Sequence, residues 1–125
     1  MGTFIITEHE AERAGHHFDL YLSTTDDCTN FLAWALPKGI PEVKGVKKLA
    51  VRVADHAPPQ ALFEGEIKEG YGKGTKSVWD EGSYTSSGPI STSKPVRLEF
   101  FGGKVFGPYY MKYWQGNNWL IWRTS

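Results

Sequence analysis

The chain has 125 residues, which is enough for a single domain spanning residues 1–125. Lys and Arg together number 14, as do Asp and Glu, and this zero net charge excludes a protein that coats nucleic acid through bulk charge. The single cysteine, Cys28, excludes an internal disulfide framework and a cysteine-rich zinc site. No apolar run reaches the roughly 20 residues that span a bilayer, and no secretory signal is evident. We therefore expect a cytoplasmic monomer without membrane contact.

Short segments in which apolar and polar residues alternate predict strands along the whole chain. In chain order the candidates are Thr3–Thr7, His17–Leu22, Asn30–Ala35, Leu49–Ala54, Ala61–Glu66, Lys76–Trp79, Val96–Phe101, Lys104–Lys112 and Asn118–Arg123. Glu8–Ala14 could form a short helix of about two turns near the N-terminus. Eight or nine short strands in one small domain predict an all-β fold, an antiparallel barrel or sandwich. The 5 Trp, 6 Tyr and 7 Phe residues would fill its core.

Charge is unevenly distributed along the chain. Residues 1–37 carry six acids and one arginine, whereas residues 38–52 carry five basic residues and one glutamate. An acidic stretch with histidines followed by a basic stretch would suit a metal site beside an anion site. Two solvated faces would give the same pattern, so charge alone does not separate these alternatives.

Three of the four histidines, His9, His16 and His17, lie close together in the sequence. In a strand, His17 and Asp19 would project from the same face, with alpha carbons roughly 6.5–7 Å apart. An imidazole and a carboxylate so placed can bind one divalent ion, and His9 could return from a preceding loop or helix as a second imidazole. This ligand set leaves positions open for water and substrate and suits Mn²⁺, Zn²⁺ or Fe²⁺. Surface histidines beside acids are the structural alternative.

Four further residues could bind phosphate. Lys38 lies in a Pro-Lys-Gly turn, while Lys48 and Arg52 flank an apolar strand that ends at His56. Lysines near a histidine can form a cradle for phosphate oxygens. Ordinary solvent-facing lysines, and a turn histidine bonded to Asp55, are the alternatives.

Several of these residues belong to motifs that follow one another in a particular order. After His9 come His17–Leu22 (HFDLYL), Trp34–Gly39 (WALPKG), Lys48–His56 (KLAVRVADH), Phe63–Ile67 (FEGEI), Tyr71–Thr75 (YGKGT), Val78–Gly82 (VWDEG) and Trp119–Arg123 (WLIWR). In this order and spacing the chain resembles the 3′-phosphoesterase domain of bacterial DNA ligase D and its stand-alone archaeal and bacterial relatives. The resemblance extends from about Phe4 to the end of the chain.

The resemblance implies a compact β-barrel with a manganese-dependent active site on its rim. It implies that His9, His17 and Asp19 are the metal ligands, that Lys38 contacts phosphate, and that His56 is the catalytic histidine of the Asp-His motif. His17 and Asp19 would be catalytic through the metal. Mn²⁺ is the expected cofactor, with Zn²⁺ or another divalent cation as alternatives.

The implied activity is trimming of 3′ ends in DNA repair by non-homologous end joining. A terminal ribonucleoside is removed from DNA or RNA-containing DNA at a primer–template, then the remaining 3′-phosphate, which leaves a 3′-OH. A chain of 125 residues has no room for ligase or polymerase activity, so we expect separate ligase and polymerase proteins as partners.

This sequence departs from the family pattern at several phosphate-binding positions. The family usually has arginine two residues after the ligand aspartate, where this chain has Tyr21, and a second arginine where it has Lys48. Ala54 and Gln60 replace a usual acid and tyrosine, and the gap from His9 to His17 is two residues longer than usual. Losing one bidentate contact to phosphate would remove about 1.5–3 kcal/mol, or roughly ten- to hundredfold in rate. His16 or Arg52 could compensate.

Two other functions follow from other features of the sequence. The missing arginines favour a catalytically weak or inactive module that still binds DNA ends as a scaffold, with steeply salt-dependent affinity. Exposed Trp and Tyr residues would instead suit a β-sandwich that binds carbohydrate, although most of the aromatic residues alternate toward the predicted core.

Overall fold

The computed structural model describes residues 2–11, 15–23, 30–56, 64–67 and 74–124, and these residues form nine strands. The strands are β1 (Gly2–Ala11), β2 (Gly15–Ser23), β3 (Phe31–Leu36), β4 (Lys48–His56), β5 (Gly65–Ile67), β6 (Gly74–Ser86), β7 (Val96–Gly102), β8 (Phe106–Gln115) and β9 (Asn118–Arg123). Each overlaps a stretch in which alternation predicts a strand. Within the described part of the chain, no helix has the length and apolarity that crossing a bilayer requires.

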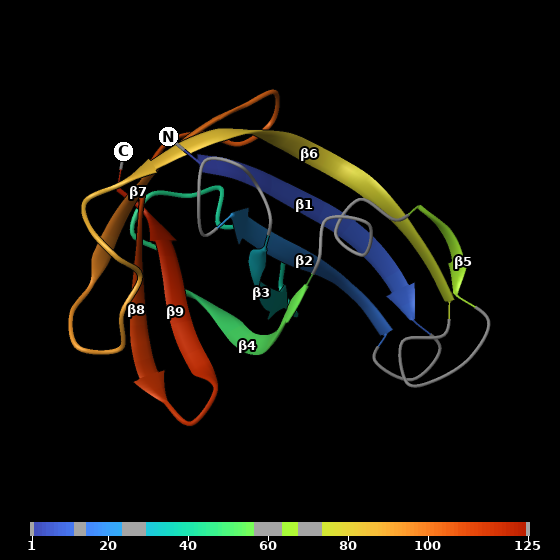
Figure 1. The fold of residues 1–125 in the computed structure, drawn as a ribbon, viewed down its shortest axis with the longest axis horizontal. Helices are drawn as coiled ribbons and strands as arrows, with labels where there is room; N and C mark the ends of the chain where they lie inside the picture. Colours follow the sequence, from blue (N-terminus) through green and yellow to red (C-terminus); the bar gives the residue numbers. More distant parts are fainter. Residues whose placement is uncertain (1, 12–14, 24–29, 57–63, 68–73, 125) are drawn as a thin grey trace.

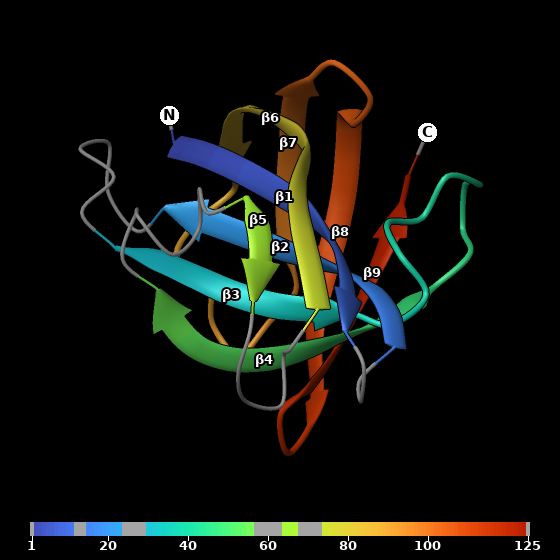
Figure 2. The ribbon, with the colours of Figure 1, turned by 90° about the vertical axis from the view of Figure 1, so that its right-hand side faces the viewer.

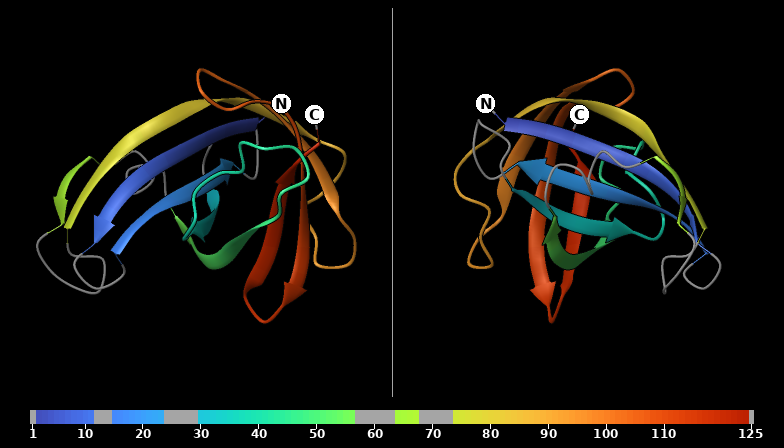
Figure 3. Two further views of the ribbon diagram at one scale, coloured as in Figure 1. Left: turned by 180° about the vertical axis from the view of Figure 1, so that it is seen from behind. Right: turned by 45° about the vertical axis from the view of Figure 1, so that its right-hand side comes forward.

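Eight of the strands close into an antiparallel barrel (Figure 1, Figure 2). Around the barrel the order is β1-β2-β3-β4-β9-β8-β7-β6, and pairing of β6 with β1 completes the ring. The ninth strand, β5, pairs with the start of β6 on the edge that β7 occupies further along (Figure 3). The predicted all-β barrel is therefore confirmed, and closure leaves few free strand edges.

The barrel interior holds one hydrophobic core to which all strands of the ring contribute. Alternate residues point inward, so Phe4 and Ile6 of β1 meet Leu20 and Leu22 of β2. Aromatic rings pack edge to face in this core, as in the contacts of Phe100 with Phe4 and Tyr109 and of Trp34 with Trp119. Not every aromatic residue is inside, because Phe106 and Trp114 are 60% and 56% exposed.

A second, smaller cluster covers the outward face of the barrel wall. Ile5, Tyr21, Phe31 and Ala33 are buried there, and Val78 packs against them. These residues alternate with those that face the interior, so β1, β2 and β3 are buried on both faces. We call this outward face of β1, β2, β3 and the first half of β6 the outer wall.

β1 is longer than the sequence pattern predicts. Glu8–Ala11, for which a short helix was one expectation, continue the strand, while residues 12–14 lie outside the described part of the chain. β1 pairs along its whole length with β2 on one side and with β6 on the other. Backbone hydrogen bonding on both edges overrides the weak local preference of this segment for a helix.

The pairing of β1 with β6 contains one irregularity. Ile6 is opposite Asp80 and Thr7 is opposite Val78, so Trp79 is an extra residue in β6 without a partner in β1. This is a β-bulge. Beyond it the register is regular, and His9 lies opposite Lys76.

We expect Tyr84→Phe to lower the free energy of unfolding by about 1 kcal/mol, because a buried hydrogen bond is lost. The Tyr84 hydroxyl donates to the carbonyl of Ser23 at 2.6 Å and links β6 to the end of β2. Urea unfolding followed by tryptophan fluorescence would measure the change. Tyr110→Phe is the matched control, since Tyr110 is half-buried and stacks on Trp122 at the surface. Equal stability of the two variants would contradict the expectation.

Candidate metal centre on the outer wall

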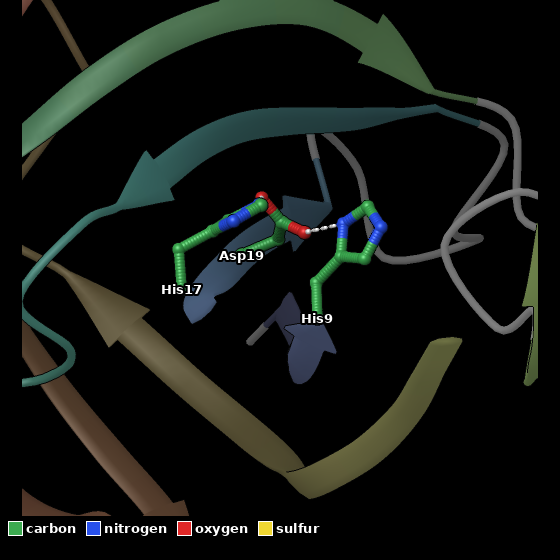
Figure 4. Close-up of side chains that lie close together, drawn as sticks. All are labelled: His9, His17 and Asp19. Carbon is green, nitrogen blue, oxygen red and sulfur yellow. Dashed lines mark ion pairs between the residues drawn. The ribbon is translucent and has the colours of Figure 1, made fainter. Parts of the chain in front are cut away.

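Two neighbouring strands bring together the three residues that the sequence singles out as metal ligands. His9 of β1 lies directly opposite His17 of β2, and Thr7 lies opposite Asp19. Because side chains at alternate positions share a face, His9, His17 and Asp19 all project from the outer wall (Figure 4). His9 thus comes from a strand, not from the loop or helix expected for it.

The Asp19 carboxylate lies between the two imidazoles (Figure 4). His9 Nδ1 is 3.5 Å from Asp19 Oδ2, and His17 Nε2 is 3.4 Å from Asp19 Oδ1. One ligand atom from each of the three residues lies within 4.8 Å of the others. The side chains are 9%, 13% and 14% exposed for His9, His17 and Asp19, so solvent screens their charges only partly.

The local hydrogen bonds of His17 suit it to hold a cation. Its Nδ1 lies 3.2 Å from the carbonyl oxygen of Gly15, which can accept the ring N–H and leave the Nε2 lone pair toward Asp19. The hydrogen bond with Asp19 is the main cause that raises the pKa of His17 above its ordinary value, while burial opposes it. The raised pKa means that this position already favours positive charge next to the carboxylate.

These donors fit a divalent cation. Two imidazole nitrogens and one carboxylate oxygen form a mixed set that suits Mn²⁺, Fe²⁺ or Zn²⁺ and leaves coordination positions for water or substrate. Among the described residues, His9, His17 and Asp19 are the His, Cys, Asp or Glu side chains that lie close enough together, in a group of at least three, to share an ion.

A buried lysine that no sequence motif marks lies beside this group. Lys76 of β6 is 8% exposed and lies opposite His9. Its ammonium donates a hydrogen bond of 2.7 Å to the hydroxyl of Tyr21 on β2 and lies 4.9 Å from the centre of the Tyr21 ring. Burial lowers the pKa of Lys76, and Asp19 partly offsets that effect. Burial and Asp19 both raise the pKa of Tyr21, so its hydroxyl stays neutral.

The structure brings Lys38 and Lys48 together next to the start of β2. Lys38 is exposed in the turn after β3, and Lys48 at the start of β4 donates to the Lys38 carbonyl at 3.1 Å. Leu36, two residues before Lys38, pairs with Phe18, the neighbour of His17. The Lys48 ammonium thus holds the backbone of the turn that carries Lys38.

Arg52 is not brought to the three metal-ligand candidates. It lies opposite Trp34, whose side chain belongs to the barrel interior, whereas Asp19 faces outward. The guanidinium donates to the carbonyl oxygens of Ala33 and Val53, pairs with Asp55 and lies 5.1 Å from the Trp34 ring. These contacts link β3 to β4. They occupy the Arg52 guanidinium, which was expected from the sequence to bind phosphate.

The last strand residue of β4 is His56, whose backbone lies opposite Phe31 of β3. Phe31 belongs to the outer cluster. The His56 side chain and all of Gln60 lie outside the part of the chain that the structure describes.

Comparison with known proteins shows which family this chain is similar to. The family model of the DNA ligase D 3′-phosphoesterase domain matches residues 7–112. The multifunctional non-homologous end joining DNA repair protein LigD of Mycobacterium tuberculosis is 36% identical over 129 residues, which cover 98% of this chain and 16% of that protein. LigD of Mycolicibacterium smegmatis is 34% identical over 98% of this chain and 17% of its own length.

A LigD protein from a third organism is also similar to this chain. LigD of Pseudomonas aeruginosa is 41% identical over 83 residues, which cover 66% of this chain and 9% of that protein. The chain thus spans about a sixth of the length of its mycobacterial relatives. The matched family model and the similarity over nearly the whole chain show that the chain belongs to the 3′-phosphoesterase domain family of DNA ligase D.

Proposed function

We propose that this domain is a metal-dependent phosphoesterase that trims the 3′ ends of DNA during end joining. It removes a terminal ribonucleoside and then the 3′-phosphate from a primer–template, and a 3′-OH remains. The convergence of His9, His17 and Asp19 on the outer wall is the observation that carries the proposal. The names of the similar proteins, which describe DNA repair by non-homologous end joining, support a repair setting for this proposed chemistry.

In this mechanism His9 Nδ1, His17 Nε2 and the Asp19 carboxylate hold a divalent cation, Mn²⁺ by family likeness. When bound, such a cation supplies Lewis-acid polarisation of a phosphate oxygen and lowers the pKa of a coordinated water. The protein contributes the placement of the ligands, because the three residues sit on two strands that are paired along their whole length.

The remaining groups bind phosphate and transfer a proton. Lys38 reaches phosphate from the turn that Lys48 holds, on the His17 side of the wall. His56 donates a proton to the leaving oxygen as a general acid. Extension of the trimmed end would fall to a polymerase activity and its sealing to a ligase activity.

The proposal is tested with a 5′-labelled primer–template that carries either a 3′-ribonucleotide or a 3′-phosphate. We expect shortening of the first and dephosphorylation of the second with Mn²⁺, and no product with EDTA. A product that forms equally well in EDTA would contradict metal dependence. Absence of any product under both conditions would remove the catalytic function.

A second function, end binding without efficient turnover, is favoured by the contacts of Arg52. The Arg52 guanidinium contacts Ala33, Val53 and Asp55. It therefore does not take over the role of the family arginine whose position is occupied by Tyr21 in this chain. This function predicts salt-dependent binding of the same primer–template with no cleavage. Loss of binding at low salt would exclude it.

We expect the affinity for Mn²⁺ to rise with pH between about 6 and 8. The metal requires a neutral His17 imidazole, and the raised pKa of His17 keeps that ring protonated to higher pH than an ordinary histidine. Below this pKa, each unit of pH should weaken binding about tenfold per proton released. Titration of Mn²⁺ followed by electron paramagnetic resonance would measure this, and constant affinity from pH 6 to 8 would contradict it.

A further inference from the structure

Burial of the Lys76 ammonium costs free energy, so its position needs an explanation. Lysine is rarely this inaccessible, since taking its charge out of water is unfavourable. Lys76 is 8% exposed, and its ammonium donates a hydrogen bond to the Tyr21 hydroxyl. Among the described residues, Asp19 is a carboxylate that acts on it electrostatically, and Asp19 also lies between His9 and His17.

The position of Lys76 relates directly to the metal-ligand candidates. β1 lies between β6 and β2, so the Lys76 side chain starts opposite His9 and reaches across β1 to Tyr21 on β2. Tyr21 is two residues after Asp19 on the same face of the same strand. The pKa of His17 is raised, mainly by its hydrogen bond with Asp19, and the positive charge of Lys76 is the smallest of the effects that oppose this rise. The ammonium therefore lies on the outer wall beside the group that would bind a cation.

We propose that Lys76 is a phosphate-binding residue of this site, with its ammonium donating to a non-bridging oxygen of the 3′-terminal phosphate, and that Tyr21 is the residue that positions it. The inference rests on the proposed phosphoesterase function. Members of the family carry an arginine two residues after the ligand aspartate. In this chain Lys76, on a different strand, would supply that positive charge. Lys76 and Tyr21 together then occupy the place of one arginine.

A purely structural role for Lys76 predicts a different outcome from a phosphate-binding role. Methionine has a similar length and no charge, so Lys76→Met would relieve the cost of burying an ammonium and keep the packing against Tyr21. Stability should then be unchanged or higher, while phosphate recognition falls. A charged group that is buried at such a cost is typical of a functional site.

The experiment compares binding of two fluorescent primer–templates, one ending in a 3′-phosphate and one in a 3′-OH, in Mn²⁺. The wild-type protein should prefer the 3′-phosphate. Lys76→Met should lower affinity for that end by about ten- to hundredfold, with a similar fall in kcat/KM, and leave Mn²⁺ affinity and Tm unimpaired. Lys112→Met, which removes an exposed lysine of β8, is the control and should match the wild type.

A rescue variant tests the role of Tyr21. In the Lys76→Met background, Tyr21→Arg should restore most of the lost preference for the 3′-phosphate, since a guanidinium on β2 again points into the site. Tyr21→Phe alone should raise KM for the 3′-phosphate severalfold, because the ammonium loses the hydroxyl that positions it.

The outcomes separate this inference from the proposed function. Cleavage absent in the wild type would remove the phosphoesterase function, and the binding comparison would still test Lys76. Cleavage present in the wild type and unchanged in Lys76→Met, with unchanged 3′-phosphate binding, would overturn the inference alone. A parallel loss of Mn²⁺ affinity and Tm in Lys76→Met would also overturn it, in favour of a structural role.

Discussion

Asp19→Ala should abolish tight binding of a divalent cation and lower turnover of a 3′-phosphorylated end by about a thousandfold or more. The carboxylate is the only charged member of the ligand set and lies 3.5 Å and 3.4 Å from the facing nitrogens of His9 and His17. Without it, two neutral imidazoles remain, and they attract a doubly charged ion far less. A thousandfold loss corresponds to about 4 kcal/mol of transition-state stabilisation, within the range expected for a lost catalytic metal.

The measurement is Mn²⁺ binding by calorimetry together with turnover of the end-labelled substrate. Glu10→Ala is the matched control, because Glu10 is an exposed acid of β1 that neighbours His9 on the opposite face. It should leave both quantities within about twofold of the wild type. Wild-type affinity for Mn²⁺ in Asp19→Ala would show that the metal, if any, binds elsewhere.

The second large effect concerns stability. Asp80→Ala should lower the free energy of unfolding by about 3 kcal/mol, or about 10 °C in Tm, because three hydrogen bonds to a carboxylate are lost together. Asp80 Oδ1 accepts from the backbone N–H of Gly103 at 3.0 Å, and Oδ2 accepts from Lys104 and Val105 at 2.9 and 2.7 Å. The side chain thus holds the turn between β7 and β8 against the barrel.

Asp80→Asn separates hydrogen bonding from packing in this position. The amide keeps the size of the side chain and one accepting oxygen, so it should retain part of the stability and fall between Asp80→Ala and the wild type. Thermal unfolding followed by circular dichroism would rank the three proteins. An Asp80→Ala protein that unfolds within 2 °C or so of the wild type would show that the turn does not depend on this carboxylate.

The fold was predictable from the sequence because its strands alternate regularly. Phe18, Leu20 and Leu22 form the inward face of β2, while Asp19 and Tyr21 face outward, as alternation predicts. The same alternation placed His17 with Asp19. The order of the strands around the barrel could not be predicted in this way, since it depends on contacts between residues far apart in the chain.

The candidate site was predictable only where its residues are neighbours in the sequence. His9 was selected, but the sequence did not indicate that it lies directly opposite His17 in a paired strand. Lys76 was missed because no local motif marks it, and it reaches Tyr21 only through pairing of β6 with β1. Arg52 was selected for its charge, yet its position on β4 directs it to backbone carbonyls and Asp55.

The extra residue Trp79 in β6 determines from which face of the barrel wall the residues before and after it project. Lys76 and Asp80 are four residues apart, and in a regular strand they would project in the same direction. Because Trp79 has no partner in β1, the alternation reverses there, so Lys76 lies beside His9 on the outside and Asp80 beside Ile6 on the inside. At the present spacing, regular pairing of β6 with β1 without the bulge would place one of the two charges on the wrong face. Deletion of Trp79 would remove the bulge together with one residue, so Lys76 and Asp80 should keep their opposite faces.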